Sequence, residues 1–182
     1  YLQFFEAWNQ PMPRDQYTIR SANFDDLAIL PVVERAAAAQ FRTTDYADLI
    51  DFELASTTVD LEREYVWVVV DRDDQPIGFA IVHIGENSLA HLHELDVHPQ
   101  HARQGLGRWL IETVAEWAQK KGMQALTLTT FGDIPWNGPY YARLGFRQLE
   151  MNELSSALQS IRDEEAAAGL PMASRICMQL DL

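Results

Sequence analysis

The stretch EYVWVVVD, residues 64–71, restricts the fold of this chain more than any other. Its apolar residues follow one another without a polar residue at every second position, and three of them are consecutive valines. A strand of this kind is typically covered on both faces, because successive side chains of a strand point to opposite sides of the sheet. We therefore expect a central sheet with other elements packed over both faces.

The rest of the chain alternates between strand-like and helix-like segments. Apolar or alternating runs predict further strands at 17–20, 77–84, 89–97, 125–131, 146–151 and 175–182. Helical spacing predicts helices at 25–41, 45–55, 107–121, 137–145 and 155–169. Pro31 either kinks the first helix or marks its first turn. This order predicts one α/β domain on a mixed sheet, with an extra helix between the last two strands.

Length and charge limit the partners of the protein. The 182 residues suffice for a single domain, and the formal net charge is −13. Such an acidic chain repels nucleic-acid phosphates and anionic membranes and favours cationic molecules, although solubility alone explains the charge equally well.

No apolar run is long enough to span a bilayer, so we expect a cytoplasmic protein. We interpret residues 1–11 as a tag remnant or N-terminal extension, and 12–182 as the domain.

A glycine turn, ARQGLGRW at 102–109, lies between a predicted strand and a predicted helix. The first amides of a helix have no partners within it, and the helix dipole favours an anion there. Gly105 and Gly107 would let a phosphate approach the backbone, and Arg103 and Arg108 could add positive charge. The turn alone is a weak signal, because glycine pairs before helices are often only turns.

Together with the later YYARLGF at 140–146, the stretch LDVHPQHARQGLGRWLIETV at 95–114 resembles the GCN5-related N-acetyltransferase (GNAT) superfamily. Its members carry an Arg/Gln-x-x-Gly-x-Gly/Ala turn between the fourth strand and the next helix, and later a Tyr-x-x-x-Gly-Phe. The resemblance implies a GNAT fold with a mixed, mostly antiparallel central sheet flanked by helices. It also implies acetyl-CoA as cosubstrate.

The resemblance assigns cofactor contacts to two segments and one further side chain. The turn amides would hold the pyrophosphate, and these belong to Arg103, Gln104, Gly105, Leu106, Gly107 and Arg108. The edge of the preceding strand would pair with the pantetheine arm through Leu95, Asp96 and Val97. Ala102 stands where the family usually has Arg or Gln, so phosphate binding rests on backbone amides. Asn137 is a weaker cofactor candidate, because it lies only four residues before the family tyrosine.

The resemblance also suggests an acid and a base. HLHELDV, residues 91–97, is similar to the His-Leu-His of arylalkylamine N-acetyltransferases, which relays the proton of the amine. His91 and His93 are two apart on a strand and share a face, unless a bulge changes the alternation. Glu94 is the competing base, and two hydrogen-bonded structural histidines are the plain alternative. Tyr141 has the spacing of the thiolate-protonating tyrosine.

Together with His91 and His93, the residues His98 and His101 form a group of histidines that could bind zinc. No HExxH motif and no cysteine pair accompanies them, since Cys177 is the only cysteine, and we expect no metal.

The sequence thus predicts an acetyl-CoA-dependent N-acetyltransferase acting on a small-molecule amine or a peptide, by direct attack in a ternary complex. Transfer of longer acyl groups, transfer to protein amines, and a non-catalytic acyl-CoA sensor are the alternatives. The extra helix at 155–169 could shape the entrance to the acceptor site or form a homodimer interface.

Overall fold

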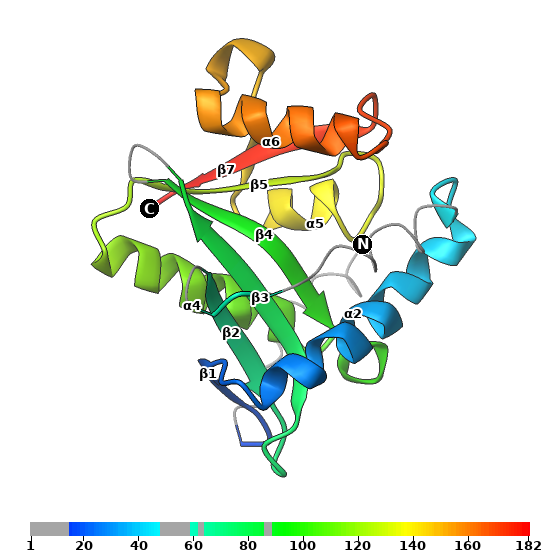
Figure 1. Ribbon diagram of the computed structural model, residues 1–182, viewed down its shortest axis with the longest axis vertical. Coiled ribbons are helices and arrows are strands. Elements are labelled where there is room, and N and C mark those ends of the chain that lie inside the picture. Colours follow the sequence, from blue (N-terminus) through cyan, green and yellow to red (C-terminus); the bar gives the residue numbers. More distant parts are fainter. Residues whose placement is uncertain (1–14, 48–58, 62–63, 86–88) are drawn as a thin grey trace, which may run out of the picture. The chain divides into compact units, whose positions relative to one another are not determined.

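A computed structural model describes residues 15–47, 59–61, 64–85 and 89–182. Within these residues, seven strands form one mixed sheet in the order β1-β2-β3-β4-β5-β7-β6; Figure 1 labels all of them except β6. Contacts divide the chain into a first unit, Tyr1–Ile81 with Glu94–Val114, and a second unit, Val82–His93 with Ala115–Leu182. The predicted α/β class with a mixed sheet and flanking helices is confirmed. The segment 1–11 and most of the helix predicted at 45–55 lie outside the described residues.

The first unit holds the strand that is apolar throughout. This strand, β2, spans Tyr65–Val70 and pairs antiparallel with β1, Thr18–Ser21. All its residues after Tyr65 are buried, as the uninterrupted apolar run predicts. Helix α2, Leu30–Ala38, packs against β2 and the following strand through a common core. The members of that core are Leu30, Val33, Val66, Val68, Val70, Phe79 and Ile81.

The helix predicted at 25–41 consists of three pieces. A 3-10 turn, η1, covers Asp26–Ala28, α2 follows, and a second 3-10 segment, η2, covers Ala39–Thr43. Pro31 lies in the first turn of α2 rather than at a kink. Proline is tolerated there because its missing N–H would have no partner within the helix.

Three elements run through both units. They are β3, Pro76–Ile84; β4, Leu89–Val97; and α4, Leu106–Lys120. Gly85 N–H donates to Leu89 O at 2.9 Å, and His98 N–H donates to Ile77 O at 2.8 Å. Between these two bonds, β4 contains one residue more than the stretch of β3 that faces it. This count indicates a β-bulge in β4, the irregularity that the resemblance raised for this strand.

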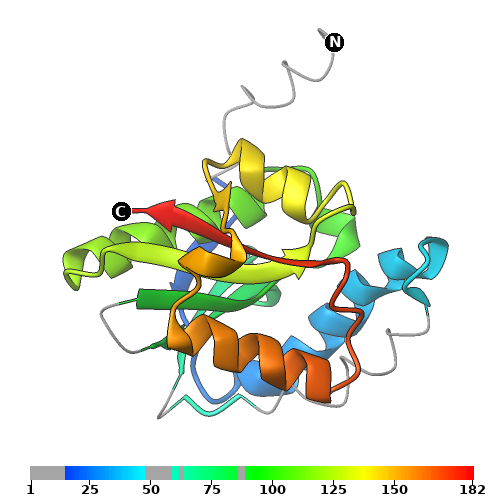
Figure 2. The same cartoon turned by 90° about the horizontal axis from the view of Figure 1, so that it is seen from above.

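The second unit contains the other strand pairs. Strand β4 pairs parallel with β5, Ala125–Phe131, from Leu89↔Ala125 to His91↔Thr127. Strand β5 pairs antiparallel with β7, Arg175–Asp181, and β6, Arg147–Gln148, pairs with the other edge of β7. Figure 2 shows α5, Gly138–Arg143, on one side of β5 and β7, and α6, Ser156–Ala167, on the other.

Helix α6 is the predicted extra helix between the last two strands. Its Leu158 packs in a small core with Leu149, Leu154 and Cys177. Glu165 near its end pairs with Arg175 of β7 and accepts a hydrogen bond from Thr129 Oγ1 of β5 at 2.5 Å. Apolar packing and a largely buried ion pair therefore fix this helix to the sheet.

Strand β6 is shorter than the predicted strand at 146–151. A capping box between Glu150 and Glu153 starts a 3-10 turn, η6, over Met151–Glu153. The reciprocal side-chain bonds of such a box satisfy backbone amides at a helix start, so the chain leaves the extended conformation there. Among the described residues, no helix is long and apolar enough to span a membrane.

Candidate active site

The turn before α4 presents backbone amides at a helix start. It follows a 3-10 segment, η5, over Pro99–His101, and it contains two residues with left-handed backbone, Arg103 at φ +61° and Gly105 at φ +81°. Gly105 O accepts from Trp109 N–H at 2.9 Å, which begins the hydrogen-bond ladder of α4. The amides from Leu106 to Arg108 precede the first donor of that ladder, and the helix dipole adds to their attraction for an anion.

Tyr17, which the sequence analysis did not single out, braces this turn. Its buried side chain places Oη 2.9 Å from His101 Nδ1 and donates to Gln104 Oε1 at 3.3 Å. The rings of Tyr17 and His101 meet edge to face at 5.7 Å. A buried phenol therefore fixes the loop on which Arg103 and Gly105 adopt left-handed conformations. The contact joins residues 84 positions apart, so no local sequence pattern could predict it.

The guanidinium of Arg108 is paired with a carboxylate within α4. Arg108 Nε donates to Glu112 Oε1 at 2.6 Å one helical turn further on, and both side chains are partly exposed. The nearby carboxylate offsets much of the guanidinium charge. The ion pair thus leaves the backbone amides as the main candidates for anion binding at the start of α4, in line with the expectation drawn from Ala102.

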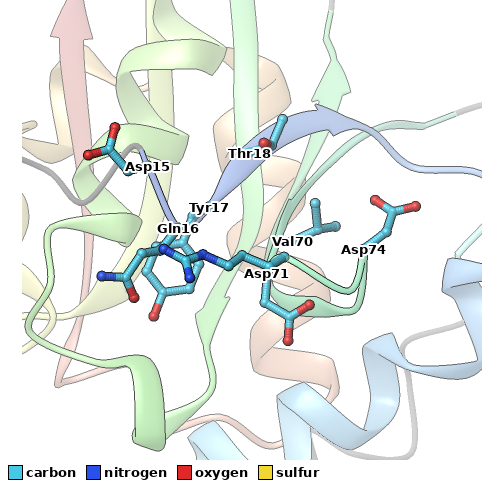
Figure 3. Close-up of a pocket in the computed structure, with 8 residues that line it drawn as sticks. Asp15, Gln16, Tyr17, Thr18, Val70, Asp71 and Asp74 are labelled. Atoms are coloured by element: carbon cyan, nitrogen blue, oxygen red, sulfur yellow. The ribbon is translucent and has the colours of Figure 1, made fainter.

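A cavity of about 270 Å³ lies elsewhere in the first unit (Figure 3). Its wall includes Tyr17, Arg72 and three aspartates, Asp15, Asp71 and Asp74. None of the residues that the sequence analysis selected for the site lines it. We therefore do not assign the cavity to the cofactor.

The strand edge predicted to bind pantetheine, Leu95–Val97, is half-buried, as is Glu94. The backbone here lies close to Gly78 of β3. A Cβ atom at Gly78 would lie 2.8 Å from Asp96 O and 2.9 Å from Val69 Cγ1. Only glycine permits this approach, so Gly78 helps to set the course of β4 at the proposed cofactor edge.

Gly78→Ala should therefore destabilise the protein by about 1–3 kcal/mol, because a backbone oxygen must move to admit the methyl group. Urea unfolding measures the loss. Gly85→Ala is the matched control, since its nearest contacts lie at 3.7 Å and 4.0 Å and require no movement. Equal midpoints for both variants would contradict the close approach.

His91 is the buried histidine of the His-Leu-His segment, with 5% of its surface exposed. Its Nδ1 lies 3.1 Å from Thr127 Oγ1, and that hydroxyl donates its proton to Ala90 O at 3.1 Å. The Thr127 oxygen can then only accept from His91, so Nδ1 carries a proton and Nε2 is the acceptor. Burial, helped by positive charge at His93, His83 and Arg175, lowers the pKa of His91 to about 3. His91 is accordingly neutral at physiological pH.

This pKa predicts a pH-dependent stability. The unfolded chain takes up a proton on His91 near pH 6.5, whereas the folded chain does so only near pH 3. The contribution is full above pH 6.5 and is lost as pH falls toward 3, because the unfolded state binds more protons in that window. Between pH 6.5 and 5 the loss should be about 2 kcal/mol.

His91→Asn keeps a donor for Thr127 without titrating in that range, so its stability should fall less over the same interval. Urea unfolding of both proteins at several pH values measures the difference. Parallel pH curves would show that His91 does not stay neutral in the folded protein.

His93 is exposed, unlike His91, and its ring stacks on a second imidazole. The partner is His83 of β3, with ring centroids 4.5 Å apart and planes inclined by 20°. No pattern in the sequence pointed to His83, because it lies outside the motif and its neighbours are apolar. The strand register brings it to His93.

Tyr141 is held by a helix cap that accounts for the Tyr-x-x-x-Gly-Phe spacing. Phe146 N–H donates to Tyr141 O at 3.1 Å, and Gly145 N–H donates to Ala142 O at 3.1 Å, the two bonds of a Schellman motif. Gly145 has φ +97°, which glycine adopts without strain. The buried Phe146 ring meets the Tyr141 ring at 5.6 Å. The motif therefore fixes the position of the phenol.

Asn137 carries a buried acceptor with no hydrogen bond from the described residues. Its Nδ2 donates to Thr130 Oγ1 at 2.8 Å, which leaves Oδ1 buried and unpaired. An unpaired buried carbonyl costs free energy, so a donor from a bound molecule would be favourable here. An amide N–H, such as pantetheine contains, is of the right kind. The Asn137 carbonyl is therefore a candidate acceptor for a ligand N–H within the second unit.

The other sequence candidates take structural positions. His98 caps η5 by accepting from Gln100 N–H at 3.3 Å, and His101 contacts Tyr17. No group of histidine, cysteine and carboxylate side chains in the described part of the chain is arranged to hold a metal ion. Cys177 is buried, and burial raises the pKa of its thiol, which suits a packing role.

Comparison with known proteins places these features in a family. A sequence model of the acetyltransferase (GNAT) family matches residues 30–146, which include β4, the turn, α4 and the tyrosine motif. An uncharacterised N-acetyltransferase of Methanocaldococcus jannaschii is 29% identical over 89 residues. That match covers 46% of this chain and 39% of the relative, so the chain spans less than half of that protein's length.

Solved structures share the fold at low identity. The PaiA N-acetyltransferase of Thermoplasma acidophilum, in complex with coenzyme A, has a TM-score of 0.68 and 16% identity, over 91% of this chain and 99% of its own. The ribosomal-protein-S18-alanine N-acetyltransferase of Escherichia coli has a TM-score of 0.61 and 20% identity, over 91% and 93%. The chain therefore shares its fold with N-acetyltransferases, one of which is named for a ribosomal protein as acceptor.

Proposed function

Because the chain belongs to the acetyltransferase (GNAT) family, we propose that it transfers an acetyl group from acetyl-CoA to the nitrogen of a primary amine. The observation that carries the proposal is the turn before α4. There Arg103 and Gly105 hold left-handed conformations, and the first amides of a fifteen-residue helix follow. Such a turn suits a pyrophosphate, which coenzyme A contains.

We assign the cofactor contacts within each unit. In the first unit, the amides from Arg103 to Arg108 bind the pyrophosphate, and the Leu95–Val97 edge pairs with pantetheine. In the second unit, Asn137 Oδ1 is a candidate acceptor for a cofactor N–H, because it is buried without a hydrogen bond from the described residues. The PaiA structure with bound coenzyme A supports a coenzyme A site in this fold. Acetyl-CoA, when bound, supplies an acetyl group activated as a thioester.

The amine must lose a proton before its nitrogen can attack. An alkyl ammonium with a pKa near 10.4 is the free base in only on the order of one molecule in a thousand at neutral pH. We assign His93 as the base, because its ring is exposed and an ordinary imidazole titrates near neutrality. His91, neutral and bonded to Thr127, is a polar neighbour of fixed orientation rather than the proton acceptor. Glu94 remains the competing base.

Two further groups complete the proposed chemistry. The backbone amide of Val97 donates to the carbonyl oxygen, where negative charge develops during attack. Tyr141 Oη gives a proton to the departing sulfur, which a phenol can do because its pKa lies just above that of a thiol. No covalent enzyme intermediate is required, in agreement with the buried position of Cys177.

The acceptor is a small-molecule amine or a peptide amine. The net charge of −13 favours a cationic acceptor. One structural neighbour is named for a ribosomal protein, but at 20% identity the likeness is one of fold, so the acceptor class stays open.

The test is CoA release from acetyl-CoA, followed by a thiol reagent, against arylalkylamines, polyamines, amino acids and short peptides. Release that depends on one class of amine would establish the reaction and its acceptor. Competition with longer acyl-CoA thioesters defines the acyl group. Binding of acetyl-CoA without turnover on any acceptor, including basic peptides, would instead favour an acyl-CoA sensor.

A further inference from the structure

A second histidine outside the motif lies against the proposed base. We propose that His83 is a positioning residue for His93, whose ring it holds in the orientation that accepts the amine proton. This inference rests on the assignment of His93 as base in the proposed function.

The geometry of the two rings is that of a stacked pair. Their centroids lie 4.5 Å apart and their planes are inclined by only 20°. The last torsion of a histidine side chain is broad, so an exposed imidazole samples many orientations unless a neighbour restricts it. A flat ring on one face of His93 removes much of that freedom. His83 therefore does for His93 what the Thr127 hydroxyl does for His91.

His83 is well placed to act as a fixed support. It is half-buried near the end of β3, directly after a run of buried residues that includes Ala80, Ile81 and Val82. Strands β3 and β4 are hydrogen-bonded neighbours in the sheet, so the backbones below both rings are held together. A side chain on such a strand keeps its place better than one on a loop.

A metal does not account for the histidine group. His83 stacks on His93, and both lie close enough to His91 to help lower its pKa, so the three imidazoles form one cluster in the second unit. Yet the described residues contain no set of side chains arranged to hold a metal ion. The cluster instead separates into a buried neutral histidine, an exposed histidine for proton transfer, and a stacked support.

Two substitutions at position 83 separate stacking from the imidazole itself. His83→Ala removes the ring, whereas His83→Phe keeps a flat ring without nitrogen atoms. We expect His83→Ala to lower kcat about tenfold while the KM for acetyl-CoA changes less than about twofold, because a misdirected base affects the chemical step. His83→Phe should restore kcat to within about threefold of the original protein, since ring orientation is retained.

The ring signals of His93 give a readout that does not depend on activity. In two-dimensional NMR spectra, the Cε1–H signal of His93 should move in His83→Ala, as the ring current of its neighbour disappears, and should stay shifted by a ring current in His83→Phe. The His93→Ala spectrum assigns the signal. Unfolding midpoints of all variants check that the fold is intact.

The outcomes separate this inference from the proposed function. An original kcat in His83→Ala, together with a slow His93→Ala, overturns the positioning role alone. Equal losses in His83→Ala and His83→Phe also overturn it, because they would require the His83 nitrogens. An original kcat in His93→Ala overturns the base assignment, and this inference with it.

Discussion

Replacing Tyr141 with phenylalanine should lower kcat by about 10²–10⁴-fold, the usual contribution of a positioned general acid. The binding of CoA should change little, because the substitution removes one hydroxyl and leaves the ring. The Phe146 contact at 5.6 Å and the Schellman bonds of the backbone at Tyr141 and Gly145 do not involve that hydroxyl. Steady-state kinetics with the best acceptor and calorimetric titration with CoA measure the two quantities.

Tyr140→Phe provides the matched control for this prediction. Its ring lies 5.4 Å from that of Tyr141 on the same short helix, and both residues are half-buried. The control should retain kcat, because the tyrosine motif assigns no proton transfer to this position. A Tyr141→Phe protein as fast as the original would exclude Tyr141 as the acid. A loss of CoA binding in that variant would indicate a binding role for the hydroxyl.

The tyrosine motif also shows why part of the site could be predicted from sequence. Its spacing is that of a helix cap, in which Gly145 supplies the left-handed residue and Phe146 packs back on Tyr141. Such bonds join residues at most five apart, so a local pattern carries all the information. The same holds for the turn before α4, where the helical spacing was expected to begin at Gly107 and the helix begins at Leu106.

Other features of the site depend on contacts between distant segments. The brace from Tyr17 to His101 and the stack of His83 on His93 require knowledge of which strand residues lie opposite each other. The stretch of β4 between two hydrogen bonds to β3 is one residue longer than the stretch of β3 that faces it, and one residue of register changes the face on which a side chain lies. The different environments of His91 and His93 therefore could not be read from the motif, in which the two look equivalent.

The strand predicted at 146–151 is longer than the observed β6, because a local capping signal was not recognised. Glu150 and Glu153 have the spacing of a capping box, and the structure contains both reciprocal bonds. Arg147 adds an ion pair to Glu153 at 2.8 Å. The apolar residues around this segment suggested a longer strand, but side-chain bonds to backbone amides favoured a turn.

Substitution of Gly105 by valine should raise the Kd for CoA by about 10–100-fold, which corresponds to the loss of one hydrogen bond to a charged phosphate. Gly105 has φ +81°, a conformation in which an L-residue costs about 1–2 kcal/mol, and a β-branched residue fits it poorly. The turn should therefore change its backbone path and turn its amides away from the pyrophosphate. Calorimetric titration with CoA measures the affinity.

Two variants distinguish this effect from general strain and from charge. Gly122 at the other end of α4 has φ +77°, and nothing lies within 4 Å of an added Cβ. Gly122→Val should thus lower stability by a similar amount while the Kd for CoA stays unchanged. Arg103→Gly removes a guanidinium but suits its φ of +61°, so it isolates the charge. If Gly105→Val and Gly122→Val bound CoA equally well, the turn before α4 would not be the pyrophosphate site. If Arg103→Gly caused the larger loss, side-chain charge rather than backbone amides would dominate binding.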